Sequence, residues 1–216
     1  NWLAGSTGNV VTWYDQSGAG NHATQATSAN QPVIQKATKG PGYMVNFNGS
    51  SQYVTLSANY DFLNGTNLTL NAVALRTATK SATNYIFGTN SATVNYQRIS
   101  IGFNADTQAN PLGSLTSSLG TELTIPAYSV SDPVYYITGV VTPSRVGYIN
   151  GSQTGTNANT GRLGVPVGTT YSIGTGLEGA AYYYLGNLFE LLIFTSALDS
   201  TQVDTVYQNQ LSYTGT

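Results

Sequence analysis

The chain has 216 residues, of which only 7% are charged, and its formal net charge is −2 at pH 7. Its seven lysine and arginine residues are scattered along the sequence, so they cannot neutralise phosphates on the scale that nucleic acid requires, and nucleic acid is excluded as an expected partner. Because cysteine is absent, disulfides, thiolate catalysis and cysteine-ligated metal sites are excluded as well, and no apolar run approaches the roughly 20 residues of a membrane span.

Polar uncharged and aromatic residues dominate instead. The chain contains 16 Tyr, 6 Phe and 2 Trp beside many Val, Ile and Thr, which predicts a folded β protein rather than a disordered one. This length suits one undivided β-sandwich, so we expect a single domain over residues 1–216. A cysteine-free chain of this composition is typical of a bacterial exoprotein or a virion protein, so we expect an extracellular location, on a bacterial cell surface or a phage particle.

The first informative segment, residues 13–24, reads WYDQSGAGNHAT. Its two glycines among Asp15, Gln16, Ser17 and Asn21 predict a loop. Calcium takes six to eight oxygen ligands, and these side chains could supply several, so Asp15 and Asn21 are candidate calcium ligands. The alternative is a tight turn in which Asp and Asn side chains bond to their own backbone.

The aromatic residues at the start of this segment have a structural interpretation. We expect Trp13 and Tyr14 to pack in the core and at its rim. His22, the one histidine of the chain, is expected to be a turn residue rather than a proton-transfer group.

Strand signals follow along the chain. Apolar residues alternate with polar or small ones over residues 68–74 and again over 99–103, which predicts two strands with one buried face each. Residues 104–132 form either a pair of strands or a long loop. Over residues 145–156, the Asn150-Gly151 pair predicts a β-hairpin, because this dipeptide favours positive φ at both turn positions.

Tyr182, Tyr183 and Tyr184 directly precede the apolar run of residues 185–198. If the run is extended, Tyr182 and Tyr184 project to one side and Tyr183 to the other. They are candidate ligand-binding residues, since flat aromatic faces recognise carbohydrate; the alternative is that they pack in a half-buried strand.

Glu190 lies within this apolar run. A buried carboxylate is costly unless it is hydrogen-bonded, so Glu190 either accepts hydrogen bonds from backbone or tyrosine groups or faces water.

One helix is expected near the end of the chain. Asp199, Ser200 or Thr201 can cap it. An apolar stripe that can pack over one end of the sandwich is formed by Val203, Val206, Tyr207 and Leu211.

Three segments together resemble a known family. The W-x-D-x-S-G-x-G-N-x-A pattern at residues 13–23, the Gly147-Tyr148-Ile149-Asn150-Gly151 hairpin, and the closing strand from Gly186 are similar to the concanavalin A-like (laminin G-like) jelly rolls of bacterial and phage surface proteins. The resemblance implies an all-β, two-sheet antiparallel β-sandwich with one short C-terminal helix, and a rim where many relatives hold calcium. It leaves function open, because this fold hosts lectins, glycosidases, adhesins and virion components.

The residues available for catalysis are few. The chain lacks the G-x-S-x-G elbow of serine hydrolases. The glucanase relatives of the fold carry an E-x-D-x-E strand, whereas the similar strand here holds Glu190 without a second acid. Glycoside hydrolysis requires two carboxyl groups, and only Glu122, Glu178, Glu190 and six aspartates are present. We therefore expect no catalysis.

The expected function is glycan recognition or adhesion through aromatic and amide side chains, with a cell-surface polysaccharide as partner. The alternatives are a structural virion or surface-layer component that contacts other copies or neighbouring proteins, and a glycoside hydrolase.

Overall fold

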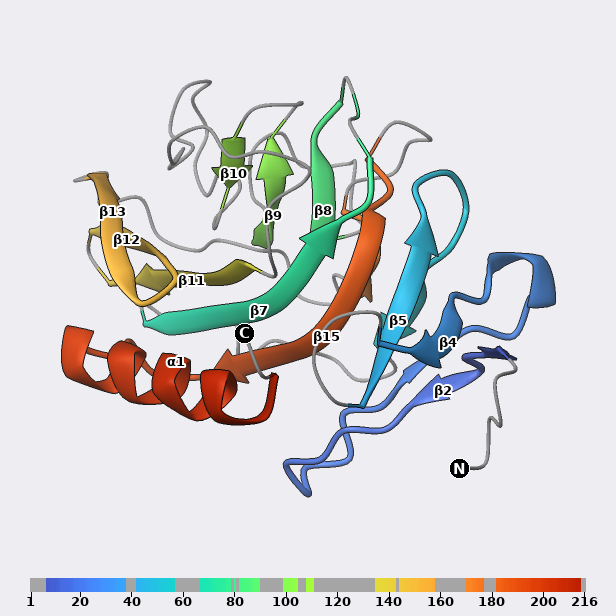
Figure 1. The fold of residues 1–216 in the computed structure, drawn as a ribbon, viewed down its shortest axis with the longest axis horizontal. Helices are drawn as coiled ribbons and strands as arrows, with labels where there is room; N and C mark the ends of the chain where they lie inside the picture. The colour runs from blue at the N-terminus through green and yellow to red at the C-terminus, as the bar shows by residue number, and fades with distance from the viewer. Residues whose placement is uncertain are drawn as a thin grey trace.

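The structure, a computed structural model, describes residues 7–37, 42–56, 67–78, 80, 82–89, 99–104, 108–110, 135–142, 144–157, 170–176 and 182–214. Within these residues, the chain forms two sheets that pack face to face, with one α-helix against the outer side of the larger sheet (Figure 1). The pairs between neighbouring strands are antiparallel. The predicted all-β, two-sheet antiparallel sandwich with a C-terminal helix is therefore confirmed.

The larger sheet has eight strands among the described residues. In spatial order they are β1 (Gly8–Asn9), β4 (Val33–Lys36), β5 (Tyr43–Asn48), β15 (Leu185–Phe194), β7 (Leu68–Arg76), β11 (Tyr135–Val141), β12 (Arg145–Ile149) and β13 (Ser152–Asn157). The closing strand β15 thus lies in the middle of the sheet, between β5 and β7.

The smaller sheet has seven strands among the described residues. In spatial order they are β10 (Gln108–Asn110), β9 (Ser100–Asn104), β8 (Asn84–Thr89), β14 (Tyr171–Ile173), β6 (Val54–Leu56), β3 (Ala23–Thr24) and β2 (Thr12–Trp13). A short 3₁₀ helix, η1 (Ser28–Asn30), follows β3.

Aromatic rings fill much of the space between the sheets. Phe87 and Tyr171 stack with their ring centres 5.6 Å apart, and Phe103 and Tyr184 stack at 6.1 Å. Each such pair contributes about 0.5–1.5 kcal/mol beyond the burial of its area. Ile99, Ile101 and Phe103 lie in this core, as the alternation over residues 99–103 predicts. Ser100 and Gly102 are buried as well, so the prediction of a single buried face was wrong for this strand.

Strand β7 differs from its prediction, because both of its faces are buried. Leu68, Leu70 and Ala72 face the core between the sheets, as the alternation predicts. Val73 points the other way and is equally buried, because α1 (Ser200–Thr214) covers this side of the sheet. The prediction of one solvent-facing side was therefore wrong here, and the long run of buried residues is explained by the helix.

The predicted hairpin is confirmed in β12 and β13. Ile149 pairs with Ser152 across the turn, and Asn150 and Gly151 have φ values of 50° and 74°. These values are those of a two-residue type I′ turn. The Asn150 Oδ1 atom also accepts a hydrogen bond of 3.2 Å from the Tyr136 N–H, which joins the turn to β11.

Helix α1 begins with a reciprocal cap. Asp199 Oδ1 accepts a hydrogen bond from the Gln202 N–H at 2.9 Å, and Gln202 Oε1 accepts one from the Asp199 N–H at 3.0 Å. This arrangement satisfies two backbone donors at the helix start. Val203, Tyr207 and Leu211 then pack against the outer side of the larger sheet, so the apolar stripe is buried as predicted but on a sheet face rather than over one end of the sandwich. Among the residues that the structure describes, no helix is both long and apolar enough to cross a membrane.

The larger sheet splits beside β15. β5 pairs with β15 only at residues 185–188, whereas β7 pairs with it as far as Phe194. The pairing with β5 ends where a bulge between Leu188 and Glu190 shifts the register of β15, and Figure 1 shows the two strands diverging from there. Within the described chain, residues 189–194 of β15 therefore have a strand partner on one side only. We call the other side the open edge of β15; it presents backbone N–H and C=O groups without a strand partner.

Candidate functional site

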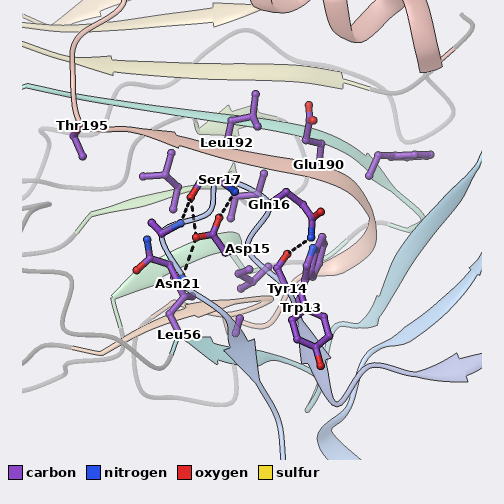
Figure 2. A pocket seen from close by; sticks show the side chains of 16 residues that line it. Trp13, Tyr14, Asp15, Gln16, Ser17, Asn21, Leu56, Glu190, Leu192 and Thr195 are labelled. Carbon is purple, nitrogen blue, oxygen red and sulfur yellow. Dashed lines mark hydrogen bonds between the residues drawn. The ribbon is translucent and has the colours of Figure 1, made fainter.

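A cavity of about 770 Å³ lies between the open edge of β15 and the loop of residues 14–22, here called the 14–22 loop (Figure 2). Sites for small molecules commonly have volumes of about 300–1,000 Å³. One wall is formed by Trp13 and the loop, the other by residues 189–193 of β15, and Ala23, Leu56 and Ile173 of the smaller sheet add an apolar floor. The opening and closing motifs of the sequence therefore meet at one cavity.

Asp15 organises the 14–22 loop. Its Oδ1 accepts a hydrogen bond from the Ser17 N–H at 2.8 Å, and its Oδ2 accepts from the Ser17 hydroxyl at 2.8 Å and the Asn21 N–H at 2.9 Å. The backbone bonds from Ser17 and Asn21, followed by that of the Ser17 hydroxyl, hold the pKa of the Asp15 carboxyl below its ordinary value. Gly18 and Gly20, with φ values of 85° and 76°, let the chain turn around this carboxylate.

Asp15 and Asn21 are the predicted calcium ligands, and their hydrogen bonds can be compared with what a calcium ion requires. Both Asp15 oxygens already accept hydrogen bonds from donors of the loop, and Asn21 reaches them with a backbone N–H rather than an oxygen. The described residues contain no cluster of three or more His, Cys, Asp or Glu side chains that could hold a metal ion. In this conformation the donor set fits the hydrogen-bonded turn better than a calcium ion, and calcium binding stays a prediction.

His22 supports the same loop. Its Nδ1 accepts a hydrogen bond of 3.1 Å from the Asp15 N–H, and its ring meets the Tyr14 ring edge-on at 5.0 Å. The expected turn role of His22 is confirmed by these contacts.

Tyr14 lines the cavity, although the sequence analysis did not name it as a candidate binding residue. Trp13 packs against the core as predicted, but the Tyr14 side chain is 61% exposed at the mouth of the cavity. The expectation that Tyr14 packs at the core rim was therefore wrong. The signal was its place directly beside Trp13 at a strand end, where successive side chains point to opposite sides.

Of the two interpretations of Glu190 that the sequence left open, the structure shows the hydrogen-bond acceptor. Its Oε2 accepts hydrogen bonds from Gln210 Nε2 at 2.6 Å and from the Tyr213 hydroxyl at 2.7 Å, so its carboxylate is held against α1. Burial, with this bond to Glu190, raises the pKa of Tyr213 well above its usual range. Figure 2 shows Glu190 and Leu192 pointing away from the 14–22 loop, so the carboxylates of Asp15 and Glu190 lie on opposite sides of β15.

The three consecutive tyrosines lie away from this cavity. Tyr184 is fully buried, and its hydroxyl donates to the backbone carbonyls of Leu75 and Asn187 at 3.0 and 3.1 Å, so its ring cannot meet a ligand. Tyr182 and Tyr183 are half-buried beside Tyr85 and Tyr53. A ligand-binding role for Tyr182 and Tyr183 stays a prediction.

Some candidates lie outside the described residues. They are Glu122, Glu178 and most of the segment 104–132.

Comparisons with known proteins give the fold. No family model and no curated protein sequence matches the chain. Among solved structures, the sialidase of Trypanosoma rangeli in complex with sialic acid has a TM-score of 0.68 at 16% identity, over 97% of this chain and 32% of the sialidase. Domain 4 of the extracellular GH43 arabinanase AbnA from Geobacillus stearothermophilus, in complex with arabinotriose, has a TM-score of 0.60 at 15% identity, over 82% of this chain and 81% of that one. A heptameric SAP-like pentraxin from Limulus polyphemus has a TM-score of 0.52 at 23% identity, over 66% of this chain and 70% of that chain.

These likenesses show a β-sandwich of the concanavalin A-like, jelly-roll kind, and no family model confirms the finer laminin G-like resemblance. The chain spans about a third of the length of the sialidases that it matches. The expectation that the chain is no enzyme is corrected here, because the sandwich is shared with chains of a sialidase and with a domain of an arabinanase. At these identities the likeness carries the fold and not the reaction.

Proposed function

We propose that this domain binds glycans, and that the saccharide lies in the cavity between the 14–22 loop and β15. The observation that carries the proposal is the combination of groups around this cavity. An exposed tyrosine ring stands at its mouth, side-chain amides and a hydroxyl line the loop wall, and aliphatic side chains form the floor.

This combination suits a sugar because a pyranose or furanose ring has both apolar and polar parts. The C–H groups of the ring can pack on the Tyr14 ring and on the floor around Leu56 and Ile173. The hydroxyls both donate and accept hydrogen bonds, and the side-chain amides of Gln16 and Asn21 bring groups of both kinds to the cavity wall.

The comparisons support a carbohydrate partner. The arabinanase domain is described in complex with arabinotriose, and the sialidase in complex with sialic acid. The arabinanase domain is also matched over most of its own length.

We propose an extracellular place of action, on a bacterial surface or a phage particle. The support is compositional: the chain lacks cysteine, has few charged residues and is rich in Thr, Asn, Ser and Gly. Labelling intact cells or particles with an antibody against the domain tests this location. A structural role in such a particle, through contacts with other copies, is the alternative; it predicts stable self-association of the purified chain and no glycan ligand.

The test of glycan binding is a glycan array followed by titration calorimetry with the best ligand. Tyr14→Ala should weaken binding about tenfold, because the loss of one ring contact is worth roughly 1.4 kcal/mol. The matched control is the double variant Tyr182→Ala/Tyr183→Ala, which should bind as tightly as the parent chain. If the double variant loses binding and Tyr14→Ala keeps it, the glycan lies at the tyrosine run and the cavity proposal is wrong.

Glycoside hydrolysis is the second candidate, favoured by the enzymes among the structural neighbours. It requires two carboxyl groups at about 5–5.5 or 6.5–9.5 Å, whereas Asp15 and Glu190 lie on opposite sides of β15 in Figure 2. The test is release of reducing sugar from arabino-oligosaccharides and sialyllactose. Turnover that is lost in Glu178→Gln or Glu190→Gln would establish hydrolysis; no turnover at high protein concentration would reject it for these substrates.

A further inference from the structure

Resting on the proposed function, we infer that the cavity selects neutral saccharides and holds them along the open edge of β15 through backbone hydrogen bonds. Two independent observations support this inference: the charge of the lining and the missing strand partner.

The charge of the lining disfavours acidic sugars. The described residues around the cavity include the acids Asp15 and Glu190 and no lysine or arginine. The hydrogen bonds that Asp15 accepts favour its ionised form at neutral pH. An anionic sugar in the cavity would meet the negative charge of Asp15 without a cation to pair with, whereas a neutral sugar carries no such penalty.

The open edge of β15 supplies polar groups that require partners. Along a strand, alternate residues direct their N–H and C=O toward the same edge. Over residues 189–194, that edge has no strand partner among the described residues, and these residues line the cavity as far as Ile193. Leu191 and Ile193, both half-buried, line the cavity beside this edge. A row of alternating donors and acceptors matches hydroxyl groups, each of which can do both.

The 14–22 loop favours a sugar over an added peptide strand at this edge. A peptide that extends a sheet requires unoccupied space for a whole extended strand beside the edge, and pockets for alternate side chains. Here the loop stands across from the edge, and its residues Tyr14, Gln16 and Asn21 line the cavity. A sugar fits a space bounded by loop side chains on one side and by the edge of β15 on the other.

The first test is backbone amide NMR on the full chain during titration with arabinotriose and other neutral oligosaccharides, with sialyllactose and trigalacturonate as acidic ligands. For the neutral ligand that binds, alternate amides of residues 189–194 should shift and become protected from hydrogen exchange, while the Tyr182 and Tyr183 amides stay unchanged. Binding without any change at residues 189–194 would overturn the inference. A poly-Thr-Val hexapeptide is titrated in parallel, and if it protects these amides while no sugar does, the edge binds peptide and the inference is wrong.

The second test is a charge variant that does not depend on the strand. Gln16→Lys places a cation at an exposed position of the cavity wall and should raise the affinity for acidic oligosaccharides about tenfold at low salt. Gln153→Lys, at an exposed position of β13, is the matched control and should leave that affinity unchanged. If the parent chain already prefers acidic over neutral sugars, the selectivity inference fails while glycan binding stands. If no sugar of either kind binds, the proposed function fails as well.

Discussion

Asp15 determines the shape of the loop wall. Its two carboxylate oxygens collect three hydrogen bonds from residues that follow it in the sequence, so a single side chain replaces the backbone partners that a regular element would supply. The sequence offered this turn as one of two interpretations of Asp15. The place of Tyr14 beside Trp13 indicates that its ring points away from the core, but not how much of the ring stays exposed, because exposure also depends on what packs above it.

This arrangement makes the stability of the loop depend on pH. The pKa of Asp15 is lower in the folded chain, so its contribution to stability is present above the unfolded value of about 3.9 and is lost as the pH falls through the folded value. Asp15→Asn should therefore lower the melting temperature at pH 6, and the difference from the parent chain should shrink below about pH 4. Asp204→Asn, which removes an exposed aspartate from α1, controls for the loss of one charge. A deficit of Asp15→Asn that is the same at pH 6 and pH 3 would contradict the role given to the carboxylate.

Among the elements, α1 explains the second buried face of β7, which the alternation of apolar residues in the sequence did not predict. The hairpin and the helix were predictable because their signals are local: a two-residue turn sequence and a cap followed by an apolar stripe. The two buried faces of β7 and the bulge in β15 were not, since both depend on neighbours distant in sequence. Val73 is buried by Tyr207 and Leu211, which no periodicity within β7 can report.

The cap of α1 can be tested directly. Asp199→Ala removes the side-chain acceptor for the Gln202 N–H but keeps the backbone N–H that donates to Gln202 Oε1, and should cost about 1 kcal/mol in the free energy of unfolding. Urea titration followed by circular dichroism measures this loss. Ser200→Ala, at the exposed first residue of the helix, is the control and should change the midpoint little. Equal effects of the two substitutions would show that the cap does not stabilise α1.

At the scale of the whole molecule, the fold joins segments from the two ends of the sequence. Residues 13–21 and 189–195 line one cavity, and the family resemblance drawn from both segments predicted the sandwich correctly. The cavity itself could not be predicted, because it arises where β5 and β15 separate. Neither strand has a sequence pattern that predicts this separation.

The low charge of the molecule has a measurable effect. The whole chain has only seven basic and nine acidic residues, so ion pairs contribute little to its stability. Screening of charges by salt should therefore change that stability little. Raising NaCl from about 20 to about 500 mM should shift the melting temperature by less than about 2 °C. Sodium sulfate at the same ionic strength is the control and should raise it, because sulfate is excluded from the protein surface. A large fall of the melting temperature on addition of NaCl would mean that charge pairs contribute more to stability than the composition implies.

The register shift in β15 sets which side chains share a face. Leu188 and Leu191 both contact the core although they are three positions apart, which a regular pleat does not allow. A bulge also bends the strand that carries it, and the pairing with β5 stops at that point. Removing one residue at Phe189 would restore a regular pleat and exchange the faces of the residues that follow, so a change of chain length there should disturb the sheet more than a substitution does.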